Sequence, residues 1–226
     1  FTDRDKAAAH LEAGAPMVIV SAPSNGADAT FVYGINHTDF DKSKHKVVSN
    51  ASCTTNCFVP MVKVLDDNFG VEQGLMTTIH AYTGDQMLVD GPHSDLRRAR
   101  AAAVNIVPAS TGAARATGLV LQAMKGKLDG IAMRVPVPDG SVVDLFVEVE
   151  KTLSVESVHA AIRSAAESKR LNGILQFVAS PVVSSDIIGN SHSSIFVADW
   201  TQIIEDDKPA KKGNLLKVLS WYDNEW

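Results

Sequence analysis

Apolar and polar residues alternate along several stretches of this chain with the two-residue period of a β-strand. The clearest stretch runs from Val142 to Glu150, where every second residue is apolar. This alternation predicts a strand with one face on a core and the other face in water. Residues 17–23 form a short apolar run ended by turn residues, which is typical of a buried strand in a parallel sheet. Further strands are predicted over 74–82, 130–137, 193–204 and 214–222.

Other stretches carry helix signals. Residues 53–69 predict a helix that is kinked or restarted near Pro60 and that ends before Gly70. A helix is also expected at the beginning of the chain, capped by Thr2 and stopped by Gly14. Two more helices are predicted over 112–127 and 154–170. Residues 83–110 show little periodicity, and residues 206–213 are expected to lengthen a hairpin.

Length, net charge and cysteine count indicate a globular protein and argue against nucleic-acid, membrane and metal partners. The chain has 226 residues, of which 45% are hydrophobic, so it is long enough to bury a sizeable core. Its formal net charge of −5 argues against a nucleic-acid partner, because such surfaces need a basic excess. No apolar run reaches the roughly 18 residues of a membrane span and no signal-peptide pattern opens the chain, so we expect a cytoplasmic protein without membrane contact. Two cysteines are too few for a zinc site or a disulfide scaffold, so no metal is expected.

Both cysteines lie four positions apart in the segment SNASCTTNC, residues 49–57. Cys53 stands at the predicted start of a helix, where unpaired N–H groups and the helix dipole favour a thiolate. Its neighbours are hydroxyl and amide residues, which suit an anionic ligand better than apolar packing does. Cys57 lies one turn deeper and is interpreted as a small buried residue.

A nucleophilic cysteine requires a base, and the chain has seven histidines. His80 is the strongest candidate, because it ends an apolar strand where the chain leaves the sheet and side chains converge. His10, His37, His45 and His159 lie in helical or loop stretches that indicate solvated faces. A cysteine with a histidine also occurs in proteases and acyltransferases, so this pair alone leaves the reaction open.

Five further segments follow SNASCTTNC in a specific order: IHAYTGDQ, DLRRARAAAVNIVPASTGAA, RVPVPDGSVVDL, SSDIIGN and SWYDNEW. With these segments the whole chain resembles the phosphorylating glyceraldehyde-3-phosphate dehydrogenases. The resemblance implies that Cys53 is the nucleophile and that His80 is the base. It implies oxidation of an aldehyde through a cysteine thioester, with NAD as the cofactor and 1,3-bisphosphoglycerate as the product. Glyceraldehyde 3-phosphate and inorganic phosphate are the implied substrates.

The resemblance also implies two anion sites. The phosphate of the substrate would be held by the residues matching Thr83, Asp85 and Arg134. Because a carboxylate cannot accept a hydrogen bond from a phosphate dianion, we expect Asp85 to orient Arg134 or a hydroxyl group. Cofactor contacts are implied for Asn224, at the nicotinamide carboxamide, and for Ser21. The attacking phosphate would be held by the residues matching Ser52, Thr54, Thr111 and Gly112.

The implied architecture combines α/β and α+β parts. Residues 1–52 would be the tail of a Rossmann-type dinucleotide-binding domain, residues 53–219 a catalytic α+β domain with a large mixed, partly antiparallel sheet, and residues 220–226 a return toward the first domain. The chain lacks the glycine-rich turn and the closing helix of the family, which indicates a partial chain. A homotetramer is implied, with the basic run Leu96–Arg100 at subunit contacts.

Two alternatives stay open from the sequence. An erythrose-4-phosphate dehydrogenase would share the cysteine and histidine segments. A fragment without enzymatic activity would act only as a thiol-bearing binding module. A cysteine hydrolase is less favoured, because no third orienting group is evident.

Overall fold

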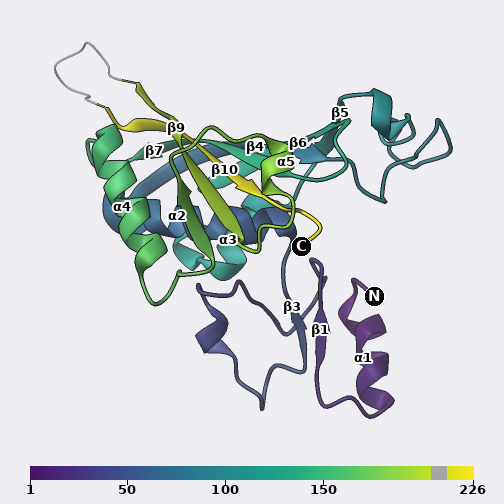
Figure 1. Ribbon diagram of the computed structural model, residues 1–226. Coiled ribbons are helices and arrows are strands. Elements are labelled where there is room, and N and C mark those ends of the chain that lie inside the picture. The colour runs from purple at the N-terminus through teal and green to yellow at the C-terminus, as the bar shows by residue number, and fades with distance from the viewer. Residues whose placement is uncertain (205–212) are drawn as a thin grey trace.

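The computed structural model describes residues 1–204 and 213–226, and in this part of the chain the strands form two sheets (Figure 1). A small parallel sheet comes from the beginning of the chain, and a seven-stranded mixed sheet comes from the rest. The expected combination of an α/β part with an α+β part is confirmed. The predicted connection over 206–213 lies, apart from Gly213, outside the described residues.

The small sheet contains β1 (Val18–Val20), β2 (Ala29–Thr30) and β3 (Val47–Ser49) in the order β1-β3-β2. All neighbouring strands are parallel, as predicted for the first of them. The prediction that this strand is buried is wrong in part. Ile19 is 62% exposed, because α1 (Arg4–Glu12) packs its Ala7 against Val20 and leaves the other face of β1 uncovered.

The first helix begins one residue later than expected. Asp3, not Thr2, is the N-cap of α1, and its carboxylate accepts hydrogen bonds from the N–H groups of Asp5 and Lys6. A carboxylate serves this position well, because it adds a negative charge to the positive end of the helix. The helix ends at Glu12, and Gly14 follows with a positive φ of 101°.

The large sheet has the strand order β5-β6-β4-β7-β10-β9-β8. The pairs β4–β6 and β8–β9 are parallel, and the other neighbours are antiparallel, so the sheet is mixed as expected. Short β5 and β8 were not predicted from the sequence. The strands are β4 (Val71–Ala81), β5 (Val107–Ser110), β6 (Leu128–Val135), β7 (Ser141–Val149), β8 (Leu175–Val178), β9 (Ser194–Ile204) and β10 (Leu215–Tyr222).

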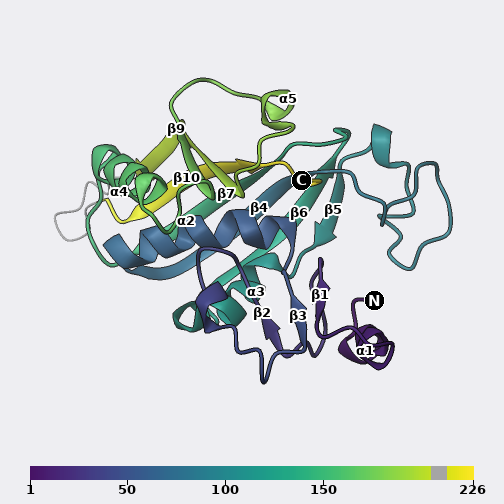
Figure 2. The same cartoon turned by 60° about the horizontal axis from the view of Figure 1, so that its bottom comes forward.

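One face of the large sheet is covered by helices, with α2 (Cys53–Phe69) lying across its strands (Figure 2). The helix is continuous through Pro60, so the predicted restart does not occur. It ends where Gly70 adopts a φ of 73°, a left-handed conformation that glycine tolerates. Beside α2 lie α3 (Ala113–Val120), shorter than predicted, and α4 (Val155–Glu167); α5 (Ser184–Ile187) was not predicted.

The core lies between α2 and this face of the sheet. Phe58, Met61 and Leu65 of α2 are fully buried, and they belong to one cluster with Leu145 of β7 and Val218 of β10. The opposite face, predicted to be wet, carries large apolar residues instead: Leu75 is 67% exposed, Ile131 50% and Phe146 44%. Among the described helices none is long and apolar enough to cross a membrane.

Candidate active site

The entry to α2 is shaped by an unusual backbone conformation. Ala51 has a φ of 58°, in the left-handed region that residues other than glycine rarely adopt. This residue turns the chain from β3 into the helix and is itself buried. Ser52 is then the N-cap, and its Oγ accepts the N–H of Thr55 at 3.0 Å. Cys53 is therefore the first helical residue, as predicted.

His80 meets this cysteine from the carboxyl end of β4. Its Nε2 lies 3.5 Å from Cys53 Sγ, within contact distance for a proton transfer from sulfur to nitrogen. The imidazole is only 3% exposed and packs edge to face on Tyr222, with ring centroids 5.8 Å apart. The two residues that the sequence selected as nucleophile and base are thus brought together from elements 27 positions apart.

Burial shifts both groups toward their neutral forms. It raises the pKa of the Cys53 thiol, against the opposing effects of the Thr54 hydroxyl and the Arg134 charge. Burial and then the charge of Arg134 lower the pKa of His80 to about 4. The lowered thiol pKa expected from the helix N-terminus is therefore wrong for this geometry, because desolvation outweighs the helix end. A neutral imidazole remains a proton acceptor beside a neutral thiol.

Arg134 lies next to His80 because β6 and β4 pair in parallel with these two residues in register. One guanidinium nitrogen is 2.5 Å from His80 Nδ1 and 3.3 Å from the carbonyl oxygen of Ala81. Nδ1 is also 2.7 Å from that carbonyl, which can only accept a hydrogen bond. In the tautomer with the proton on Nδ1, Nδ1 and Arg134 both donate to the Ala81 carbonyl, Arg134 does not donate to Nδ1, and the lone pair of Nε2 faces Cys53. Arg134 Nε is buried and has no hydrogen-bond partner among the described residues, so it is available to an anion.

Thr83 and Asp85 follow β4 and contact each other directly. The Thr83 hydroxyl donates to one carboxylate oxygen of Asp85, and Arg98 pairs with the other at 2.6 Å. The expectation that Asp85 orients a hydroxyl is confirmed, while its arginine partner is Arg98 rather than Arg134. Burial alone would raise the pKa of Asp85, but the Thr83 hydroxyl and the charges of Arg134 and Arg98 hold it below its usual value.

Arg98 belongs to the basic run that composition alone would assign to a solvated face. Its side chain is 21% exposed, whereas Arg97 and Arg100 are each 62% exposed. It also donates to the carbonyl of Ser110, at the end of β5. The sequence of residues 83–100 gave no sign of this contact, which depends on how the irregular segment folds back on itself.

The residues expected to hold the attacking phosphate divide into two groups. Ser52 and Thr54 flank Cys53 at the start of α2, and Thr54 Oγ1 lies 4.0 Å from Cys53 Sγ. Thr111 and Gly112 precede α3, where Thr111 Oγ1 accepts the N–H of Ala113 at 3.2 Å and Gly112 is the N-cap. No side-chain hydrogen bond within the described residues joins the second group to the first, so their shared role stays a prediction.

Asn224 and Ser21 line the same cavity as Cys53, with a volume of about 370 Å³. The orientation of Asn224 follows from the hydrogen bonds of Ser141. The Ser141 oxygen accepts the N–H of Ala81 at 3.0 Å, so its own proton is donated to Asn224 Oδ1 at 2.6 Å. Asn224 Nδ2 is thereby left as a buried donor without a partner among the described residues. Such a donor fits the carbonyl oxygen of a carboxamide.

Ser141 and Tyr222 were not identified from the sequence. Both are fully buried polar residues on neighbouring strands, β7 and β10, and both contact predicted site residues. A serine at a strand start and a tyrosine in an apolar strand are common, so nothing in the local pattern distinguishes them. Cys57, by contrast, is buried as interpreted, and burial raises its pKa to about 12. Among the described residues no cluster of metal-ligating side chains occurs.

Comparison with known proteins gives a consistent result. Residues 52–224 match the family model described as glyceraldehyde 3-phosphate dehydrogenase, C-terminal domain. Over 226 residues the chain is 58% identical to glyceraldehyde-3-phosphate dehydrogenase of Mycobacterium avium and 57% identical to that of Mycobacterium tuberculosis (strain ATCC 25618 / H37Rv); all of this chain and 64% of each relative are covered. It is 54% identical to glyceraldehyde-3-phosphate dehydrogenase 2 of Streptomyces avermitilis, covering 65% of that relative. The chain thus spans less than two thirds of the length of these curated relatives.

Proposed function

Because this chain belongs to the glyceraldehyde-3-phosphate dehydrogenase family, we propose that it supplies the catalytic residues of an NAD-dependent, phosphorylating aldehyde dehydrogenase. The substrates are glyceraldehyde 3-phosphate and inorganic phosphate, and the product is 1,3-bisphosphoglycerate. The observation that carries the proposal is the 3.5 Å contact between Cys53 Sγ and His80 Nε2 at the start of α2. The alternatives, an erythrose-4-phosphate dehydrogenase and a binding module, are not favoured by these relatives.

The first step uses His80 as a general base. Its Nε2 takes the thiol proton of Cys53 while the sulfur attacks the aldehyde carbon, which forms a C–S bond and a hemithioacetal. Bound NAD would accept the hydride from that carbon, which leaves a thioester on Cys53. The unpartnered Nδ2 of Asn224 supports a role in holding the nicotinamide carboxamide, and Ser21 lies in the same cavity.

The second step releases the acyl group to phosphate. A phosphate oxygen attacks the acyl carbon, the C–S bond breaks, and the sulfur of Cys53 takes a proton with His80 as the shuttle. Ser52, Thr54, Thr111 and Gly112 would hold this phosphate through hydroxyl and N–H groups. Arg134 and Thr83 would hold the phosphate of the substrate, with Asp85 orienting Thr83 and Arg98.

The experiment that tests this function measures NADH formation by the full-length protein that contains this chain. We expect NADH formation from glyceraldehyde 3-phosphate that requires phosphate and that disappears in Cys53→Ala. Erythrose 4-phosphate is the competing aldehyde and should be the poorer substrate. Activity that persists in Cys53→Ala would contradict the assignment of the nucleophile, and equal use of both aldehydes would contradict the substrate.

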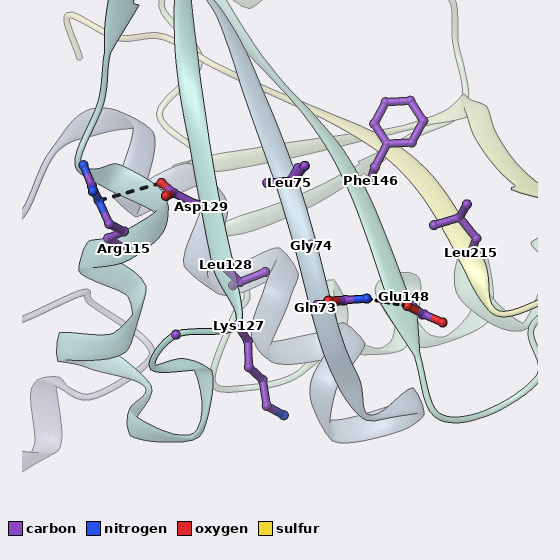
Figure 3. Close-up of a pocket in the computed structure, with 11 residues that line it drawn as sticks. Gln73, Gly74, Leu75, Arg115, Lys127, Leu128, Asp129, Phe146, Glu148 and Leu215 are labelled. Atoms are coloured by element: carbon purple, nitrogen blue, oxygen red, sulfur yellow. Dashed lines mark hydrogen bonds and ion pairs between the residues drawn. The ribbon is translucent and has the colours of Figure 1, made fainter.

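We further propose a homotetramer in which a second copy covers the open face of the large sheet. Leu75 and Phe146 point from β4 and β7 into a hollow of about 560 Å³, and Arg115–Asp129 and Gln73–Glu148 pairs stand beside it (Figure 3). An apolar patch with polar pairs around it suits a two-fold contact between identical surfaces. Light scattering should give a smaller particle for Phe146→Asp than for the control Val183→Asp, and an unchanged mass would contradict this contact.

The domain limits of 1–52, 53–219 and 220–226 remain a proposal. Strand β10 continues to Tyr222, and residues 223–226 line the Cys53 cavity together with Ser21 and Asn50. Limited proteolysis of the full-length protein, with the fragment ends read by mass spectrometry, would test whether cleavage falls near residue 52. A cytoplasmic location and the lack of a nucleic-acid partner stay predictions from the sequence.

A further inference from the structure

Two walls of the Cys53 cavity are joined by the carboxylate of Asp223. One wall is the turn after β10, residues 223–226, and the other is the loop after α5, residues 190–193. Within the turn, Asp223 Oδ1 accepts two backbone N–H groups at 2.8 and 2.9 Å. Its Oδ2 accepts the N–H of Gly189, at the start of the loop, at 2.8 Å. The same side chain therefore shapes the turn and fastens it to the loop.

Each wall is also anchored to a different strand of the large sheet. In the loop, Asn190 donates from Nδ2 to Oε1 of Gln176 on β8 at 2.8 Å. In the turn, Asn224 accepts from Ser141 on β7. These anchors fix the two side chains individually. The bond that Asp223 makes to the loop is what joins the backbone of one wall to the backbone of the other.

The surroundings of Asp223 keep its side chain ionised. Burial alone would raise the pKa of Asp223, but the N–H groups of Gly189, Trp226 and Glu225 hold it below its usual value. Burial and then the charge of Asp223 raise the pKa of neighbouring Asp139, so Asp139 is the member of the pair that takes up a proton first. Asp223 stays an acceptor with a full negative charge, and hydrogen bonds to a charged group are roughly twice as strong as neutral ones.

The consequence concerns Asn224, which directly follows Asp223 in the turn. Its Nδ2 is a buried donor without a partner among the described residues, aimed at the place proposed for the nicotinamide carboxamide. We propose that Asp223 is a positioning residue for the nicotinamide end of the cofactor, because it holds the turn of Asn224 against the facing loop. This inference rests on the proposed function, which assigns the carboxamide to Asn224. Asp223 acts through the backbone and does not need to touch the cofactor.

The test measures the dissociation constants of three ligands by titration calorimetry on the full-length protein. NAD is compared with ADP-ribose, which lacks the nicotinamide, and with NADH, whose nicotinamide ring is uncharged. Asp223→Asn keeps one oxygen for the N–H groups of the turn but sets its own amide N–H against that of Gly189, so the link to the loop is lost. We expect the Kd of NAD and of NADH to rise at least about tenfold, and that of ADP-ribose to stay within about threefold.

Two more variants bracket this result. Asp223→Ala removes all three hydrogen bonds and should raise the Kd of NAD and NADH further, again with little change for ADP-ribose. Asp66→Asn is the matched control, because Asp66 is a half-buried carboxylate that accepts the N–H of Val71 at 3.0 Å at the far end of α2 from Cys53. All three dissociation constants should stay at the wild-type values in this control. Should Asp223→Ala fail to fold, the values for Asp223→Asn decide the matter.

The pattern across the three ligands separates positioning from other roles. An equal loss of affinity for ADP-ribose and NAD in Asp223→Asn would indicate general destabilisation and would overturn the inference. Weaker binding of NAD with unchanged NADH would show that the carboxylate attracts the positive ring, which would overturn it as well, and so would unchanged binding of all three. In each of these cases phosphate-dependent NADH formation by the wild-type protein leaves the proposed function intact. Wild-type protein that binds none of the three ligands would contradict the function itself.

Discussion

The first and second turns of α2 each carry a cysteine, and the two thiols differ in almost every physical respect. Cys53 lines a cavity and faces His80, whereas Cys57 is fully buried and faces the carbonyls of Ser220 and Trp221 at 3.6 and 3.7 Å. Both have a pKa raised by burial, but only for Cys57 does it reach about 12. One helical turn therefore separates a thiol that a ligand and a base can reach from a thiol that only packs.

The largest difference between the two cysteines is expected in kcat when each is replaced by serine. Cys53→Ser should lower kcat on the order of 10⁴-fold or more, because serine is a much weaker nucleophile beside a base of low pKa. Cys57→Ser should keep kcat within about threefold and act on stability instead. Steady-state NADH formation measures both. Comparable losses of kcat in the two variants would show that the second turn also takes part in the reaction.

Alkylation tests the same contrast without turnover. At pH 8 the pKa of about 12 leaves Cys57 roughly 10³-fold less ionised than a thiol at 9.0, and burial also excludes the reagent. Iodoacetamide should therefore label Cys53 in the folded protein and leave Cys57 unmodified, as read by peptide mass spectrometry. In urea both should react at similar rates. Labelling of Cys57 in the folded protein at a rate within tenfold of Cys53 would contradict the difference.

His80 contacts Cys53 in the first turn of α2, and its replacement tests the role of this contact in catalysis. His80→Asn removes the proton acceptor of Cys53 and should lower kcat at least about 100-fold. The control His159→Asn changes a half-buried imidazole, which contacts Thr201 and two phenylalanine rings and lies outside the proposed site. Its kcat should stay near the wild-type value. If the two variants lost activity equally, the contact between Cys53 and His80 would not be the catalytic one.

Two buried serines, one near each cysteine, should differ in their effect on the KM for NAD, and this difference is smaller than those above. Ser141 orients Asn224 in the cavity of Cys53, whereas Ser194 contacts Ser220 at 2.8 Å beside Cys57. Ser141→Ala should raise the KM for NAD about tenfold with a smaller change in kcat, because Asn224 loses the donor that fixes its amide. Ser194→Ala should leave that KM unchanged. An equal rise in the KM for NAD in both variants would contradict the proposal that Ser141 orients Asn224, and would indicate a general loss of stability instead.

Local pattern was sufficient for the parts of the fold that repeat over many residues. The alternation from Val142 to Glu150 predicted β7, and the helix signal over 53–69 with its stop before Gly70 predicted α2. Strands β5 and β8 were missed because four residues carry too little pattern. The identity of the cap at Asp3 and the exposure of Ile19 depend on side-chain direction and on neighbours in space, which sequence spacing does not contain.

The candidate site, like the fold, was predicted in part from the sequence. Cys53 and His80 stood out by their neighbours and their places at element ends, and the resemblance to a family supplied the other candidates. The contacts of Arg98 with Asp85 and of Ser141 with Asn224 join residues 13 and 83 positions apart, so only the fold reveals them. The pKa directions of Cys53 and His80 likewise follow from burial, which a helix-terminus argument does not include.

The most direct test of the account is to trap the acyl group on the enzyme. The full-length protein is mixed with glyceraldehyde 3-phosphate and NAD without phosphate, quenched in acid within one turnover, and digested for mass spectrometry. We predict an acyl thioester on Cys53, none on Cys57, and loss of the adduct when phosphate is added before the quench. An adduct on Cys57, or NADH formation with no adduct on Cys53, would contradict the claim that Cys53 carries the reaction.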